Sequence, residues 1–150
     1  MPDNDKDAFL KSIAKGKRLL GLDIGEKTIG LALSDTELNI ASADETIKRK
    51  KFTKDAEILK SKIEEFDVGG LVIGLPLELN GNEGKKCQSV RQFGRNFQKL
   101  FEIPIFFQDE RFSTVAAEET LLEADMSREK RKEVIDKVAA SYILQNFLDS

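Results

Sequence analysis

Apolar and polar residues follow two different patterns along this chain, and each pattern predicts a different kind of element. Short apolar segments bounded by turn residues predict buried strands. Five strands are expected, at residues 18–24, 28–34, 40–47, 70–75 and 103–107. Because only Gly25-Glu26-Lys27 separates the first two, they are expected to pair as a hairpin.

Apolar residues that recur every three or four positions predict amphipathic helices. Such patterns cover residues 53–66, 114–124 and 127–148, and a further helix follows the polar loop 76–84 with an apolar stripe of Val90, Phe93, Phe97 and Phe101. The element order is β-β-β-α-β-α-β-α-α. Strands joined through a helix pair in parallel, so this order predicts an α/β fold with a mixed five-stranded sheet and helices on both faces.

Length and composition then restrict the chemistry. The chain has 150 residues, with no histidine and a single cysteine. A length of this order suits one domain, expected at 17–150, after an N-terminal extension, 1–16, that we expect to be flexible. The lack of histidine excludes Ser-His-Asp and Cys-His catalysis and His-ligated zinc. The lone Cys87 fits a reducing cytoplasmic compartment, and no apolar run approaches the roughly 20 residues that span a bilayer.

Three acidic positions fall where a carboxylate is costly. Asp23 lies inside the apolar run LLGLDIG, Asp109-Glu110 follows the apolar run IPIFFQ, and Asp136 shares a helical stripe with Ala140, Ile143 and Phe147. A buried carboxylate requires a partner that compensates its charge. Hard cations prefer oxygen ligands, so Mg²⁺ or Mn²⁺ held by Asp23, Glu110 and Asp136 could activate water for phosphodiester cleavage without histidine.

Each of these acids also has an ordinary structural interpretation. Asp23 could cap the hairpin turn, Glu110 could pair with Arg111, and Asp136 could pair with Lys132 one helical turn away. For any one residue the two interpretations carry similar weight. Together the three acids favour the catalytic one.

Four segments in order resemble the YqgF family of pre-16S rRNA nucleases, which are also described as Holliday-junction-resolvase-like. The segments are GLDIGEKTIGLALSD (21–35), VIGLPLELNG (72–81), DERFSTVAAEETL (109–121) and KRKEVIDKVAASYILQNFLD (130–149). The resemblance implies an RNase H-like fold and a metal-dependent nuclease that processes the 5′ end of pre-16S rRNA. It also implies that Asp23, Glu110 and Asp136 are the catalytic, metal-binding acids. Gln108 and Glu78 depart from the family pattern, and we expect Glu78 to face solvent.

The net charge of −3 hides basic clusters that could bind a nucleic-acid backbone. The clusters are 48–51 with Lys54, the basic residues of 84–101, and residues 128–132. The candidate nucleic-acid-binding residues, chosen from two of these clusters and from the sequence around the acids, are Lys27, Lys85, Lys86, Arg91, Arg95, Arg111, Arg128 and Arg131. The competing interpretation of each cluster is a solvated helix face.

Three other functions stay open from the sequence. A Holliday junction resolvase would cut branched DNA and would also require a dimer. The spacing Asp23-x-Gly25-x4-Gly30 resembles the phosphate-binding hairpin of actin-like ATPases, although those proteins duplicate the domain. A ribosome-assembly factor that binds RNA without cleaving it would be the alternative that is not an enzyme.

Overall fold

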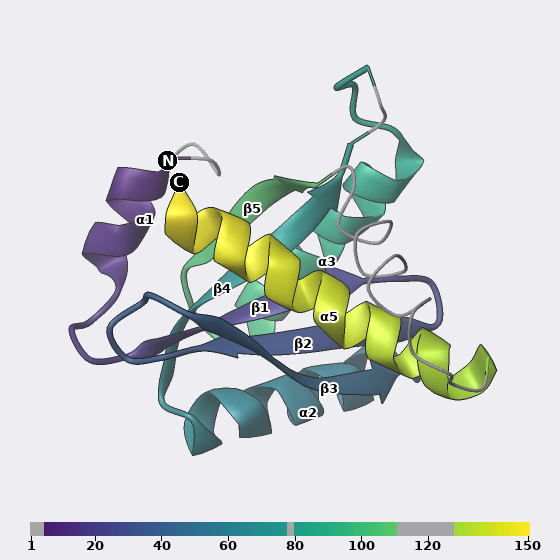
Figure 1. Ribbon diagram of the computed structural model, residues 1–150, viewed down its shortest axis with the longest axis horizontal. Coiled ribbons are helices and arrows are strands. Elements are labelled where there is room, and N and C mark those ends of the chain that lie inside the picture. The colour runs from purple at the N-terminus through teal and green to yellow at the C-terminus, as the bar shows by residue number, and fades with distance from the viewer. Residues whose placement is uncertain (1–4, 78–79, 111–127) are drawn as a thin grey trace.

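The strands of this protein form one mixed sheet (Figure 1). The computed structural model describes residues 5–77, 80–110 and 128–150. The strand order is β3-β2-β1-β4-β5, with β1 Arg18–Ile24, β2 Thr28–Ser34, β3 Ala41–Lys48, β4 Val68–Pro76 and β5 Ile105–Glu110. The β1–β2 and β2–β3 pairs are antiparallel, while β4 pairs in parallel with β1 and with β5. The predicted mixed five-stranded sheet and its opening hairpin are confirmed.

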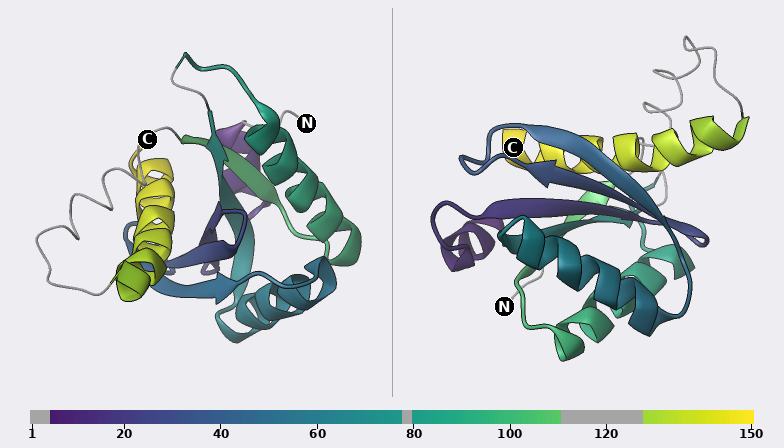
Figure 2. Two further views of the ribbon diagram at one scale, coloured as in Figure 1. Left: turned by 90° about the vertical axis from the view of Figure 1, so that its right-hand side faces the viewer. Right: turned by 90° about the horizontal axis from the view of Figure 1, so that it is seen from below.

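Helices cover both faces of the sheet (Figure 2). One face packs against α2, Phe52–Glu65, and α3, Lys85–Leu100, whose buried Phe93 and Phe97 belong to the larger apolar core. The other face packs against α5, Arg128–Asp149, which buries Ala140, Ile143 and Phe147. The predicted helix 114–124 lies outside the described residues.

Strand β5 extends three residues further than the apolar run predicts. Its register pairs Leu75 with Asp109 and Pro76 with Glu110. β4 also continues past its apolar segment, so it offers these polar residues a strand partner, and an edge strand tolerates polar side chains. Glu110 therefore ends a strand instead of following one.

Residues of the N-terminal extension pack on the sheet, in contrast to the flexible segment that we expected. Lys6–Ser12 form helix α1, with Asp5 as its N-cap. Phe9 is only 3% exposed, and its ring contacts Phe106 and Phe147. Three adjacent apolar residues, Ala8, Phe9 and Leu10, in a short polar segment give little periodic signal, so the sequence pattern did not indicate this helix.

Helix α5 approaches the hairpin so closely that only glycine fits beneath it. A Cβ atom on Gly30 of β2 would lie 2.0 Å from the backbone oxygen of Asp136. Non-bonded atoms do not approach to that distance without displacement of the backbone. Gly30 therefore sets how near Asp136 comes to the end of β1.

Candidate active site

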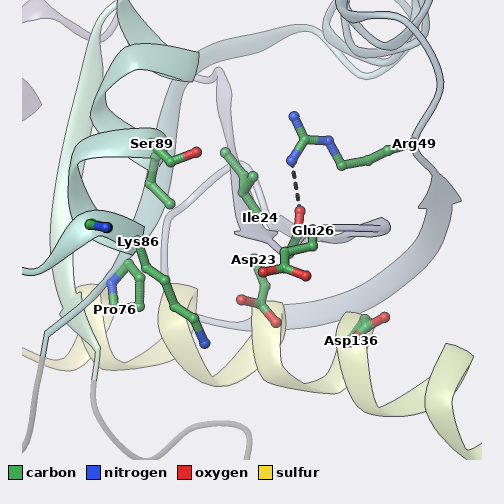
Figure 3. Close-up of a pocket in the computed structure, with 11 residues that line it drawn as sticks. Asp23, Ile24, Glu26, Arg49, Pro76, Lys86, Ser89 and Asp136 are labelled. Carbon is green, nitrogen blue, oxygen red and sulfur yellow. Dashed lines mark hydrogen bonds between the residues drawn. The ribbon is translucent and has the colours of Figure 1, made fainter.

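Asp23 and Asp136 line the same cavity, of about 630 Å³, although 113 residues separate them in sequence (Figure 3). Asp23 lies near the end of β1, and Asp136 lies on the face of α5 that packs over the hairpin. The lining comprises Asp23, Ile24, Gly25, Glu26, Arg49, Pro76, Lys85, Lys86, Ser89, Val90 and Asp136. The cavity thus gathers residues from the first hairpin, the β3–α2 loop, the end of β4, α3 and α5.

The surroundings of Asp23 oppose its ionisation. Burial, and then the negative charges of Asp136 and Glu110, raise the pKa of Asp23 from 3.8 to about 7. Both effects disfavour the charged carboxylate. A perturbed acid in a cavity, next to two other acids, is the arrangement expected of a functional site.

A hydroxyl group orients Asp136. Thr28, the first residue of β2, donates a hydrogen bond of 2.6 Å from Oγ1 to Oδ2 of Asp136. A short bond from a hydroxyl to a carboxylate is charge-assisted and directional. Thr28 was not among the residues predicted for the site, because one threonine in a strand gives no sequence signal for this role.

Glu110 belongs to the acidic cluster electrostatically, but it does not line the cavity. It pairs with Pro76 at the end of β5, and its backbone oxygen accepts a hydrogen bond of 3.1 Å from the backbone N–H of Leu77. Its charge contributes to the raised pKa of Asp23. The three predicted acids therefore come from distant elements and lie within electrostatic reach of one another.

The cavity lining carries three basic residues that balance three acids. Lys85 and Lys86, at the start of α3, were predicted to bind nucleic acid, and both are exposed at the cavity. Arg49 comes from the β3–α2 loop and was named in the sequence only as part of a basic run.

The third acid of the lining is Glu26 in the hairpin turn, a residue that sequence reasoning missed. Its signal was its place two residues before Thr28 in the GLDIGEKT segment.

The other predicted basic residues have varied surroundings. Lys27 is exposed in the hairpin turn, and Arg95 is exposed on α3 and donates to Gln92. Arg91 instead forms two hydrogen bonds with Glu83, of 2.8 and 3.1 Å, and its guanidinium lies 5.1 Å from the centre of the Phe107 ring. Arg131 is half-buried on α5.

Three residues from the sequence predictions cannot be placed as side chains. Arg128 begins α5, but only its backbone is described. Arg111 and Glu78 lie outside the described residues.

The donor set suits a hard divalent cation. Clustered carboxylate oxygens are the ligands that Mg²⁺ and Mn²⁺ prefer, and a nearby cation would favour the ionised form of Asp23. The described residues contain no group of three or more His, Cys, Asp and Glu side chains already spaced to hold a metal. The acids are thus near one another without being closed around a coordination sphere.

Within residues 5–77, 80–110 and 128–150, no helix is both long enough and apolar enough to cross a bilayer.

Comparison with known sequences gives a match over almost the whole chain. The family model described as "RuvX: Holliday junction resolvase" matches residues 17–150. A protein of Paramagnetospirillum magneticum named "Putative pre-16S rRNA nuclease" is 56% identical over 142 residues, which cover 95% of this chain and 92% of the relative. A protein of Roseobacter denitrificans with the same name is 53% identical over 147 residues, which cover 97% and 90% of the two chains.

Comparison with solved structures identifies the fold. The RuvC protein of T. thermophilus, solved in complex with a Holliday junction substrate, superimposes with a TM-score of 0.52. The match covers 87% of this chain and 93% of that one, at 12% sequence identity. The architecture is RNase H-like, as the sequence resemblance implied.

Proposed function

Because the chain belongs to the RuvX Holliday junction resolvase family, a family of nucleases, we propose that it is a metal-dependent phosphodiesterase that processes the 5′ end of pre-16S rRNA. The observation that carries this proposal is the acidic cluster at the cavity, where burial, and then the charges of Asp136 and Glu110, raise the pKa of Asp23 to about 7. Carboxylates that repel one another favour a bound cation, and the basic residues in the same cavity favour a phosphate beside it.

Asp23, Glu110 and Asp136 are the residues that would hold Mg²⁺ or Mn²⁺. A bound divalent cation supplies an activated water and stabilises the leaving 3′ oxygen. The chain contributes the orientation: Thr28 fixes a carboxylate oxygen of Asp136, and Lys85 and Lys86 offer positive charge to backbone phosphates at the cavity. Arg111 and Arg128 stay candidates for further phosphate contacts from the sequence.

The substrate assignment rests on the relatives. Proteins that are more than half identical to this chain carry the name "Putative pre-16S rRNA nuclease", and they are matched over about nine tenths of their length. Sequence identity of this degree supports a shared substrate. Since precursor rRNA is made and processed in the bacterial cytoplasm, we place the protein there.

A cleavage assay tests the proposal. The wild-type protein should cut a precursor 16S rRNA fragment in Mg²⁺ and leave it intact in EDTA. Asp23→Asn should reduce the rate by about a thousandfold or more, because it removes a cation ligand at the centre of the site. Asp67→Asn is the matched control, because Asp67 precedes β4 at the opposite end of the sheet and pairs there with Lys17. Unchanged cleavage by Asp23→Asn would disprove the site assignment.

The family description also supports a second substrate, a four-way DNA junction. The same assay should therefore carry a four-way junction and a linear duplex of the same sequence. Preferential cleavage of the rRNA fragment supports the first proposal. Symmetric cuts in the junction alone would replace it with junction resolution.

A further inference from the structure

Arg49 is tied by two hydrogen bonds to the hairpin turn that follows Asp23. Its backbone N–H donates to the backbone oxygen of Lys27 at 2.8 Å, and its guanidinium Nη1 donates to the backbone oxygen of Gly25 at 2.7 Å. Arg49 directly follows β3, which lies at the edge of the sheet. The position of this side chain is therefore coupled to the turn beside the acids.

A completely buried carboxylate lies close to the same guanidinium. Asp55, in the first turn of α2, is 0% exposed, and its Oδ1 accepts a hydrogen bond of 3.0 Å from the backbone N–H of Lys50. Its Oδ2 has no hydrogen-bond partner and lies 3.9 Å from Nε of Arg49. A buried carboxylate requires a compensating cation, and Arg49 is placed to provide that charge.

An aromatic ring completes the support. The guanidinium carbon of Arg49 lies 5.5 Å from the centre of the Phe93 ring, which belongs to α3 and is buried. Cations are attracted to the faces of aromatic rings at this distance. Contacts from the turn, from α2 and from α3 thus restrict one side chain that is still 26% exposed.

The exposed part of Arg49 lines the cavity that contains Asp23 and Asp136. In Figure 3, Arg49 and Lys86 enter this cavity from opposite sides, and Asp23 lies between them. Lys86 is an exposed side chain on α3, whereas Arg49 is held on several sides. A guanidinium has five N–H donors, so the bonds described above leave others available to a ligand.

We propose that Arg49 binds a backbone phosphate of the nucleic acid beside the bond that is cleaved, and that Asp55 positions the guanidinium for this contact. The inference deepens the proposed nuclease function and rests on it. An arginine held in place before binding loses less conformational freedom when it binds a phosphate, and its planar fork matches two phosphate oxygens. A buried acid that compensates and orients this arginine has no need to touch the substrate itself.

Steady-state cleavage of the precursor rRNA fragment tests the first half of the proposal. Arg49→Ala should lower kcat/KM by more than about tenfold, as expected for a lost charge-assisted contact. Arg49→Lys should recover only part of this loss, because it keeps the charge without the fork. Arg18→Ala is the matched control: Arg18 also donates from Nη1 to a backbone oxygen, that of Phe66, but it lies at the start of β1, away from the cavity. We expect Arg18→Ala to stay within about threefold of wild type.

A salt titration separates phosphate binding from a purely structural role. RNA affinity should be measured in the Asp23→Asn background, in which the RNA stays intact. Adding Arg49→Gln should reduce the slope of log affinity against log salt by about 0.7, the value for one phosphate contact with a single strand. A residue that only supports the turn would change the affinity and leave the slope unchanged.

A double-mutant cycle tests the second half. Asp55→Asn keeps the shape of the side chain and removes its charge, so it should lower kcat/KM in the wild-type background. It should have little further effect in Arg49→Ala, because Asp55 is proposed to act through Arg49. Melting temperatures of all variants report whether each one is folded. If Arg49→Ala does not fold, Arg49→Lys and Arg49→Gln replace it in the measurements.

The outcomes keep the two proposals apart. If the wild-type protein cleaves the RNA and the Arg49 variants match Arg18→Ala in kcat/KM and in salt slope, the role of Arg49 is overturned and the nuclease function is not. Additive effects of Asp55→Asn and Arg49→Ala overturn the positioning role of Asp55. A wild-type protein that cleaves neither RNA nor junction DNA overturns the nuclease function, and the role of Arg49 with it.

Discussion

Asp23 and Asp55 are both aspartates enclosed by the fold, but the charges around them have opposite signs. Asp55 is completely buried beside the guanidinium of Arg49 and accepts the backbone N–H of Lys50. Asp23 lies beside Asp136 and Glu110, and these carboxylates add to burial in raising its pKa to about 7. Asp55 has its compensating cation, Arg49, within the chain. The charges of described residues that shift the pKa of Asp23 come instead from other carboxylates, which repel its ionised form.

This difference separates an acid that is compensated within the chain from one that we propose to bind a cation. A carboxylate compensated by a fixed arginine gains nothing from a further cation. A carboxylate disfavoured by burial and by two other acids gains from any cation that enters the cavity, which supports our proposal that Asp23 binds one. Arg49 connects the two environments, because it compensates Asp55 and lines the cavity of Asp23.

Disturbing the position of Asp136 should have the largest effect on the acidic cluster. In Gly30→Ala the new methyl group would overlap the backbone oxygen of Asp136, so α5 must move away from the hairpin. We expect a loss of roughly 3 kcal/mol in the free energy of unfolding, at the upper end for overpacking against a backbone. Urea denaturation measures this loss, and an NMR titration of Asp23 should show its pKa fall part of the way towards 3.8.

Gly94→Ala is the control for this substitution. Its Cβ would come within 2.9 Å of Cζ of Phe107, and the tip of a side chain can shift through a small rotation about χ1, whereas a helix backbone cannot. This variant should lose much less stability. Equal losses in the two variants would show that the approach of α5 to Gly30 is less restrictive than the distances indicate.

Removing the buried acid should have the next largest effect. Asp55→Ala leaves the N–H of Lys50 without its acceptor and Arg49 without its carboxylate. We expect a loss of roughly 2–3 kcal/mol, below the full cost of breaking a buried ion pair because Arg49 is partly exposed. Chemical denaturation gives the value. The exposed Asp67, changed to Asn, should lose far less, and a similar loss there would contradict the structural role of Asp55.

The three acids could be singled out from the sequence because their signal is local. Asp23 interrupts an apolar strand, and Asp136 falls on the buried stripe of a helix, so each position carried its own evidence of burial. The hairpin and the mixed sheet followed from apolar runs and from the order of strands and helices. The resemblance to a nuclease family then named the same three residues.

Contacts that form only when the chain folds could not be predicted in this way. Arg49 and Asp55 pair across a loop, and in the sequence Arg49 was one of several adjacent basic residues. Thr28 and Asp136 are joined by a hydrogen bond between β2 and α5 that no pattern in either segment indicates. Helix α1 was missed because it is short and its apolar residues, Phe9 and Leu10 among them, do not recur at a helical period.

The pH dependence of stability offers a further test of Asp23. Its pKa in the folded protein, about 7, is higher than the ordinary 3.8, so the folded state binds more protons between these values. Without divalent cations, wild-type stability should therefore fall as the pH rises from about 4 to about 7, by roughly 2 kcal/mol after allowance for solvent screening. Asp23→Asn should lack most of this fall and exceed the wild type in stability at neutral pH.

Asp35 supplies a control of opposite sign for the same experiment. Backbone N–H groups of Ile40 and Asn39 lower the pKa of this carboxyl. Its contribution to stability is therefore present above the ordinary pKa and is lost as the pH falls through the lowered one. Asp35→Ala should lose stability at neutral pH, where Asp23→Asn gains it. Parallel pH profiles for wild type and Asp23→Asn would refute the perturbed state of Asp23.

The smallest expected effect belongs to the hydroxyl that orients Asp136. Thr28→Val keeps the shape and the β-branching of the side chain but removes the donor to Oδ2 of Asp136. Loss of one partly exposed hydrogen bond should cost about 1 kcal/mol or less in stability. The same loss should raise the Mg²⁺ concentration for half-maximal cleavage by about threefold, because the carboxylate is then free to rotate. Thr28→Ser, which retains the hydroxyl, should stay near wild type. An identical shift in both variants would show that the effect does not depend on the hydroxyl and would refute its orienting role.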